Sequence, residues 1–79
     1  MDDIINQPEH YTQYVVEPIE FIMTNEIDFW RGNVIKYVCR AGHKSYEGKD
    51  ETESEITDLR KAMRYCEMRI NMLNNETDL

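Results

Sequence analysis

The chain has 79 residues, of which 16 are acidic and nine are Lys or Arg, so its formal net charge at pH 7 is −7. A chain this short forms one domain, here residues 1–79, and buries a modest share of its surface, so we expect it to gain stability as a homo-oligomer. The negative charge argues against binding to nucleic acid or to an anionic membrane. The apolar runs are too short for a membrane span, and no secretion signal is recognisable, which predicts a cytoplasmic protein.

The two cysteines, Cys39 and Cys66, fall at apolar positions of helical patterns. No CxxC or HxxxH spacing occurs, so a structural zinc site is not expected. Both side chains are therefore predicted to be free thiols that pack as small apolar groups in a reducing compartment.

The first 16 residues show no helical period, and we expect residues 1–16 to form an extended arm. A first short helix is predicted over residues 17–25. It would begin with Pro18, whose missing N–H is tolerated in the first turn of a helix. Its apolar side chains Ile19, Ile22 and Met23 are expected to face inward.

A second helix is predicted over residues 28–41, because Asp28 is a good N-cap and Gly42 suits the left-handed residue that often follows a helix. Its predicted buried stripe consists of Trp30, Val34, Tyr37, Val38 and Ala41. Gly32 is unfavourable inside a helix, so we expect another group to approach the backbone closely there.

The third helix is long and is predicted over residues 54–74, after a polar and mobile loop over residues 43–53. Its cap is expected at Thr52 or Ser54. One set of apolar positions repeats at spacings of 3-4-3-4-3 and is predicted to face the core: Ile56, Leu59, Met63, Cys66, Ile70 and Leu73. A second stripe, Ala62, Tyr65, Met68 and Met72, is predicted to face another subunit. The expected fold is therefore all-α.

Basic residues are concentrated between positions 31 and 44. This segment contains four of the nine Lys and Arg residues and no Asp or Glu. Five polar side chains lie along one flank of the predicted second helix and just beyond it: Asn33, Lys36, Tyr37, Arg40 and Lys44. Arg40 offers a planar fork for phosphate oxygens and Lys36 a compact charge, so the pattern predicts a small anion pocket.

The same side chains also have a purely structural interpretation. They could pair with acidic groups of the long helix, and an ion pair between Arg40 and Asp58 is the most natural of these. The two interpretations are compatible, because a carboxylate often orients an arginine that binds a ligand. Among Tyr11, Trp30, Tyr37 and Tyr46, one ring could stack on a nucleotide base.

Several common motifs are absent from the sequence. It has no GxxxxGK[ST] phosphate loop, no GxGxxG turn and no recognisable nucleophile arrangement. Two pairs of carboxylates, Glu17 with Glu20 and Glu55 with Asp58, are spaced one helical turn apart. Such pairs are typical of magnesium sites, and they leave a magnesium-dependent, all-helical nucleotide pyrophosphatase as an alternative.

Four motifs together resemble a family of small phage proteins of largely unknown function. They are QPEHY (7–11), EPIEFI (17–22), GNVIKYVCRAGHK (32–44) and DLRKAMRY (58–65). The family includes the nucleotide kinase of a T-odd coliphage, which has no phosphate loop. The resemblance implies nucleotide binding, phosphate transfer between (deoxy)nucleotides and a location in the cytosol of a bacterial host.

The resemblance also selects site residues. It implies catalytic roles for His10, Lys36 and Arg40. It implies contacts with the nucleotide or its phosphates from Tyr11, Gly32, Asn33, Lys36, Tyr37, Arg40, Lys44, Asp58, Lys61 and Tyr65. No resident metal or cofactor is implied beyond a magnesium ion that could accompany the nucleotide. An alternative is a non-catalytic sponge that sequesters a host cyclic nucleotide or a similar immune signal, an anti-defense role.

Overall fold

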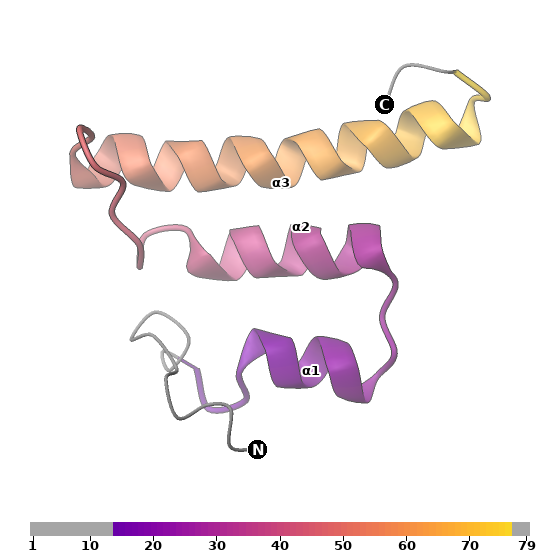
Figure 1. Cartoon of the computed structure of the whole chain (residues 1–79), viewed down its shortest axis with the longest axis horizontal. Helices are drawn as coiled ribbons and strands as arrows, with labels where there is room; N and C mark the ends of the chain where they lie inside the picture. The colour runs from indigo at the N-terminus through magenta and orange to yellow at the C-terminus, as the bar shows by residue number, and fades with distance from the viewer. Residues whose placement is uncertain (1–13, 77–79) are drawn as a thin grey trace.

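The computed structural model describes residues 14–76, which form three α-helices and no strand. They are α1 (Pro18–Thr24), α2 (Phe29–Arg40) and α3 (Glu51–Leu73). The helices lie side by side in one layer, with α2 between α1 and α3 (Figure 1), and the molecule measures 41 × 33 × 17 Å. The all-α prediction is confirmed for these residues, whereas most of the predicted arm lies outside them. No helix of the described part has the length and apolar character that crossing a membrane requires.

Helix α1 is short and loosely packed. Pro18 occupies its first turn as predicted, and the carboxylate of Glu17 accepts a hydrogen bond of 3.2 Å from the backbone N–H of Tyr14. Ile22 is half-buried, but Ile19 is 50% exposed and Met23 is 71% exposed. The prediction that Ile19 and Met23 face inward is therefore wrong, because α2 is the one helix of the described residues that packs beside α1.

Helix α2 begins at its predicted cap. The side chain of Asp28 accepts a hydrogen bond of 2.8 Å from the N–H of Arg31, and Gly42 follows the helix with a φ of +90°. Gly32 is buried, and a Cβ atom there would lie 3.1 Å from Cγ2 of Ile22. The close approach that this glycine permits is therefore made by helix α1 itself. Val38, predicted to be buried, is 50% exposed.

Helix α3 begins three residues earlier than the sequence pattern suggests. Asp50 is its N-cap and forms a reciprocal capping box with Glu53, which satisfies backbone donors at the helix start. The loop before it forms two hydrogen bonds with the helix: the N–H of Tyr46 donates to Oγ of Ser54 over 2.9 Å, and Lys49 donates to Thr57 over 2.7 Å.

The side of α3 that packs on α2 is not the one that the sequence suggested. The side of α3 that packs on α2 carries Ser54, Asp58 and Ala62, and these are its buried residues. The residues predicted to face the core are instead exposed or half-buried, with Met63 66% exposed. The prediction is wrong because Tyr37 and Arg40 of α2 are polar-tipped, and they meet Asp58 and Tyr65 on α3 rather than aliphatic side chains.

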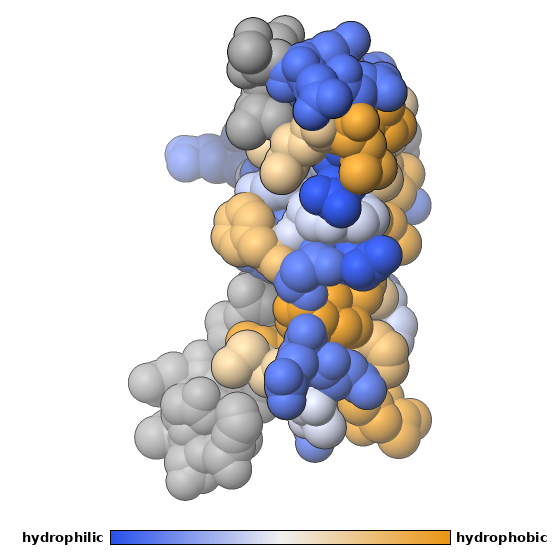
Figure 2. Space-filling model, turned by 90° about the vertical axis from the view of Figure 1, so that its right-hand side faces the viewer, coloured by the Kyte–Doolittle hydropathy of each residue, from blue (hydrophilic) through white to orange (hydrophobic). Residues whose placement is uncertain are grey.

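A single layer of helices cannot enclose a hydrophobic core, because each helix keeps two open faces. Within the described residues, Ala62 is the one buried hydrophobic residue. Figure 2 shows the consequence: apolar side chains gather along one side of the molecule, from the α3 end to the α1 end. The exposed large hydrophobic residues include Phe21, Val38, Ile56, Leu59, Met63 and Ile70.

Candidate functional site

The rings of Tyr37 and Tyr46 organise the contact between α2 and α3. The ring of Tyr37 on α2 stacks on that of Tyr65 on α3, with centroids 5.9 Å apart and an interplanar angle of 14°. Phe29, in the first turn of α2, meets the same Tyr65 ring edge-on at 6.0 Å. The second organising ring, Tyr46, comes from the loop between the two helices. Together these contacts hold the basic side chains of three segments close to one another.

Five cations surround the rings of Tyr37 and Tyr46. Lys36, Arg40 and Lys61 lie 5.0, 4.7 and 5.3 Å from the centroid of Tyr37. The Tyr46 ring is approached by Arg40, Lys44, Lys49 and Lys61, at 5.9, 5.3, 6.0 and 4.7 Å. We call these seven residues the cation–tyrosine cluster. Its positive charges are stabilised by the electron-rich faces of the rings.

The centre of the cluster is the carboxylate of Asp58, which is fully buried. Its Oδ1 atom accepts hydrogen bonds from Arg40 over 3.0 Å and from the Tyr46 hydroxyl over 2.5 Å. The Tyr46 hydroxyl in turn accepts from Arg40 over 2.6 Å and from Lys61 over 3.0 Å. The ion pair that the sequence suggested between Arg40 and Asp58 is therefore confirmed, and Tyr46 completes it.

The ion pair governs the ionisation of Arg40. Burial by itself disfavours the charged guanidinium, but the hydrogen bond and the negative charge of Asp58 outweigh this cost and raise the pKa of Arg40 above its ordinary value. Arg40 thus stays charged. Its Nε atom and Oδ2 of Asp58 are buried without a hydrogen-bond partner, so the network at this point is incomplete.

Lys36 and Lys44 differ from Arg40 in their partners. Within residues 14–76, no carboxylate forms an ion pair with either ammonium group. The five cations of the cluster thus enclose one carboxylate, that of Asp58, in a chain whose overall charge is −7. An arrangement of this kind attracts anions, because fixed positive charge here is only partly neutralised.

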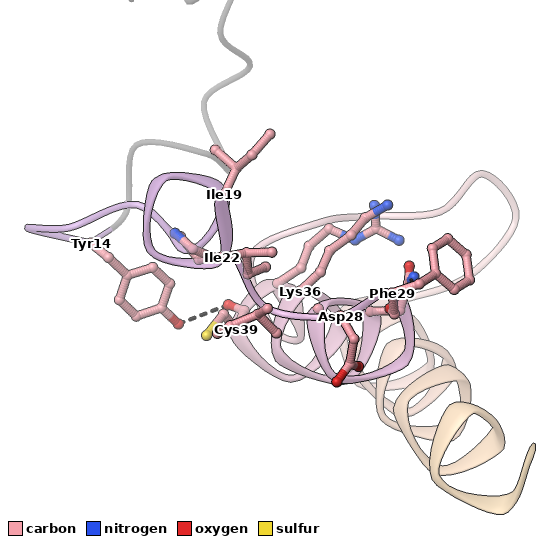
Figure 3. A pocket seen from close by; sticks show the side chains of 12 residues that line it. Tyr14, Ile19, Ile22, Asp28, Phe29, Lys36 and Cys39 are labelled. Carbon is pink, nitrogen blue, oxygen red and sulfur yellow. Dashed lines mark hydrogen bonds between the residues drawn. The ribbon is translucent and has the colours of Figure 1, made fainter. Parts of the chain in front are cut away.

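An apolar pocket of about 320 Å³ lies between α1 and α2 and reaches the cluster. Figure 3 shows Tyr14 and Phe29 at opposite ends of the pocket lining, with Ile22, Cys39 and Lys36 between them. Lys36 and Arg40 belong both to the lining of this pocket and to the cluster. The pocket volume is in the range of small-molecule sites.

Tyr14 closes one end of the pocket through its hydroxyl, which donates a hydrogen bond of 2.7 Å to the backbone oxygen of Cys39. Burial raises the pKa of Tyr14, and also that of the Cys39 thiol. Both groups are therefore neutral at pH 7, and they add no negative charge to the pocket wall. The ring of His43 packs edge-on against Tyr14 at 5.9 Å.

The structure brings together most of the residues that the sequence singled out. The members that meet in or beside the cluster are Lys36, Tyr37, Arg40, Lys44, Asp58, Lys61 and Tyr65. Asn33 lines the pocket, but its amide donates to the backbone oxygen of Phe29 over 2.8 Å. Gly32 also lines the pocket, and it faces Ile22. His10 and Tyr11 lie outside the described residues.

Sequence reasoning missed the position of Tyr46 and the pocket residues Tyr14 and Phe29. Tyr46 stands in a loop without periodicity, so no pattern indicated that its ring would turn towards α3. Phe29 directly follows the Asp28 cap, and this position at the start of a helix is the one sequence feature that could have indicated Phe29 as a pocket residue. Tyr14 and Cys39 lie 25 residues apart in the sequence, so helical periodicity does not predict the contact between them.

The paired carboxylates suggested as a magnesium site are not brought together. Asp58 is buried in its ion pair with Arg40, and one oxygen of Glu17 accepts a hydrogen bond from the backbone of Tyr14. The described part of the chain contains no group of three or more His, Cys, Asp and Glu residues that could hold a metal ion.

These features define a small all-helical protein in which a cationic cluster adjoins an apolar pocket. Residues 5–67 match the profile of the family described as a protein of unknown function, DUF3310, and the chain belongs to this family. No significant match was found among curated proteins or among solved structures.

Proposed function

We propose that this protein binds a nucleotide, with the phosphates at the cation–tyrosine cluster and the base in the apolar pocket between α1 and α2. The observation that carries the proposal is the collection of five cations around two tyrosine rings, with one internal carboxylate. A phosphate group would relieve the repulsion among these charges, because its oxygens accept several hydrogen bonds at once.

The phosphate contacts are assigned to Lys36, Lys44 and Lys61. Lys36 and Lys44 pair with no carboxylate in residues 14–76, and the hydrogen bond that Lys61 donates within these residues goes to the hydroxyl of Tyr46. Arg40 has a different role in this proposal. Its guanidinium is held by Asp58 and Tyr46, so it supplies fixed charge and positions the Tyr46 ring among the lysines.

The base is assigned to the apolar pocket because its lining is mainly aliphatic and aromatic. Phe29 is 75% exposed, and its ring is available for stacking on any base. Lys36 and Arg40 belong to the pocket lining and to the cluster, so a base held in the pocket would place its phosphates near the cluster.

The first form of this function is phosphoryl transfer between nucleotides, as the resemblance to a family with a nucleotide kinase suggests. The terminal phosphoryl group of ATP would pass to a phosphate oxygen of a deoxynucleoside monophosphate, which gives ADP and a diphosphate. Such a reaction depends mainly on positioning and charge neutralisation, which lysines provide, and a magnesium ion would accompany the ATP. His10 is assigned to the same reaction on the strength of the resemblance.

The second form is sequestration of a nucleotide signal without turnover. One observation favours it: the carboxylate within the cluster, Asp58, is fully buried and already accepts two hydrogen bonds. Its oxygens are therefore not available to hold the magnesium ion that would accompany ATP in the kinase form, and the sponge form needs no such ion. A sponge needs only the pocket and the cations, and it would release its ligand chemically unchanged.

Calorimetric titration and product analysis on the full chain test both forms. ATP, each of the four deoxynucleoside monophosphates and a cyclic dinucleotide are titrated separately, with and without Mg²⁺. Saturable binding to one of them supports the proposal, and absence of binding to all of them overturns it. Conversion of ATP plus a monophosphate into ADP plus a diphosphate identifies the kinase, whereas binding with intact ligand identifies the sponge.

A further inference from the structure

The apolar seam of α3 has no partner among residues 14–76. We use this name for Ile56, Leu59, Met63, Cys66, Ile70 and Leu73. All but Cys66 are exposed large hydrophobic residues, with Met63 66% and Leu73 65% exposed. A seam of this length at spacings of three and four residues is the pattern of a helix that pairs with another helix. A shallow groove runs beside it, lined by Arg60, Met63, Arg64 and Glu67.

The seam faces away from the cation–tyrosine cluster. Met63 follows Lys61 by two residues on α3, and Val38 follows Lys36 by two residues on α2. Two residues correspond to a turn of about 200° around a helix, so Met63 and Val38 lie on the face opposite the two lysines. The layer thus has one cationic face and one apolar face, in agreement with the apolar band of Figure 2.

We propose that a second copy of this chain covers the apolar face, with the α3 helices of the two copies paired antiparallel along their seams. The seam residues alternate between heptad positions a (Ile56, Met63, Ile70) and d (Leu59, Cys66, Leu73). In an antiparallel pair, position a of one helix packs against position d of the other. The spacing places Met63 against Cys66 of the other copy, Leu59 against Ile70, and Ile56 against Leu73. Because the pairing is two-fold symmetric, each of these contacts occurs twice.

The charges that flank the seam are complementary in this arrangement. Arg60 and Glu67 occupy the same heptad position, one heptad apart, on the side of the seam away from α2. An antiparallel pair brings Arg60 of one copy close to Glu67 of the other, and the reverse contact forms at the same time. Arg60 forms no ion pair within the described residues, whereas Glu67 accepts from Arg64 over 2.9 Å.

A parallel pair of α3 helices would pair the same charged residues less well. It would set Arg60 against Glu55 of the other copy. In the same pair Glu67 would lie opposite Ala62 of the other copy, which carries no charge and is buried against α2. Charge complementarity therefore favours the antiparallel orientation.

The second stripe of α3 is not the interface in this arrangement. Tyr65 is stacked on Tyr37 of the same chain, and Ala62 is buried against α2. The interface also leaves the cationic face open, so association of two copies does not depend on a nucleotide.

Sedimentation of the full chain at micromolar concentration, without nucleotide, tests whether a second copy binds. We expect twice the mass of the chain. Met63→Glu is expected to shift the mass to that of one chain, because it places a charge in an apolar interface. Met68→Glu, which adds the same charge away from the seam, is expected to retain the doubled mass. A monomeric wild-type protein, or loss of association in Met68→Glu alone, would overturn the proposal.

Disulfide crosslinking tests the orientation. In a Cys39→Ser background, Met63→Cys is expected to form a covalent dimer on mild oxidation, through Cys66 of the other copy. The dimer should disappear when Cys66→Ser is added. A parallel pair would place the two engineered positions side by side, so a covalent dimer that persists without Cys66 would overturn the antiparallel assignment. Neither experiment uses a nucleotide, and each can fail independently of the proposed function.

Discussion

The hydroxyl of Tyr46 donates a hydrogen bond of 2.5 Å to the fully buried carboxylate of Asp58. The two residues come from different segments, the loop before α3 and the middle of that helix. Their contact draws the loop onto the helix and places the Tyr46 ring among four cations. The same bond therefore contributes to stability and to the shape of the candidate site.

Removal of this hydroxyl should destabilise the fold. Tyr46→Phe leaves Asp58 with Arg40 as its one described donor, and we expect the free energy of unfolding to fall by about 1–3 kcal/mol, the cost of an unsatisfied buried polar group. Urea unfolding followed by circular dichroism measures the change. Tyr65→Phe is the matched control, because its ring contacts remain and none of the described hydrogen bonds uses its hydroxyl. Equal stability of the two variants would contradict the assigned role of Tyr46.

The ion pair of Arg40 and Asp58 should contribute more to the free energy of unfolding than any single hydrogen bond. Arg40→Ala leaves the Asp58 carboxylate buried without its cation, and we expect a loss of about 3–5 kcal/mol in unfolding free energy. Arg40→Met with Asp58→Leu should lose less, since both charges are removed together. Thermal unfolding of the three proteins checks the order. An unchanged melting temperature in Arg40→Ala, together with weaker nucleotide binding, would instead assign Arg40 to the ligand.

Replacement of Lys36 should weaken nucleotide binding without lowering stability, in contrast to replacement of Arg40. Lys36→Ala removes a cation that has no carboxylate partner among residues 14–76, so the melting temperature of the free protein should stay the same or rise. Nucleotide affinity should fall by about 1.5–3 kcal/mol, as expected for loss of a charge-assisted hydrogen bond. Arg31→Gln is the control for charge, because Arg31 lies on the same helix and pairs with Asp28. The same loss of affinity in both variants would point to a general charge effect.

The cap of α2 makes a pH-dependent contribution. The hydrogen bond from the N–H of Arg31 is the main cause that lowers the pKa of Asp28, and the charge of Arg31 adds to it. A lowered pKa in the folded state means that the contribution is complete above the unfolded value, about 3.9, and is lost as the pH falls through the folded value. Helix content should therefore decrease in acid. Circular dichroism should show a smaller decrease in Asp28→Asn, which keeps a neutral cap.

The local features of the fold were largely predictable. Pro18 and Asp28 marked two helix starts, and Gly42 marked a helix end, because each satisfies a local backbone requirement. The apolar period predicts the start of α3 at residue 54, whereas the helix begins at Glu51, because the capping box of Asp50 and Glu53 precedes the first apolar position. The basic residues of α2 were recognised as a group because a helix of known period places them on one flank.

The sequence by itself determined the three helices, the partner of Arg40 and the positive segment that forms much of the cluster. Only the tertiary structure decided which stripe of α3 meets α2 and where the Tyr46 ring lies. A period shows that two stripes exist, but both are apolar, so it does not show which one a neighbouring helix covers. The choice rests on Asp58, whose buried carboxylate needs Arg40 and Tyr46 beside it and therefore turns the seam outward.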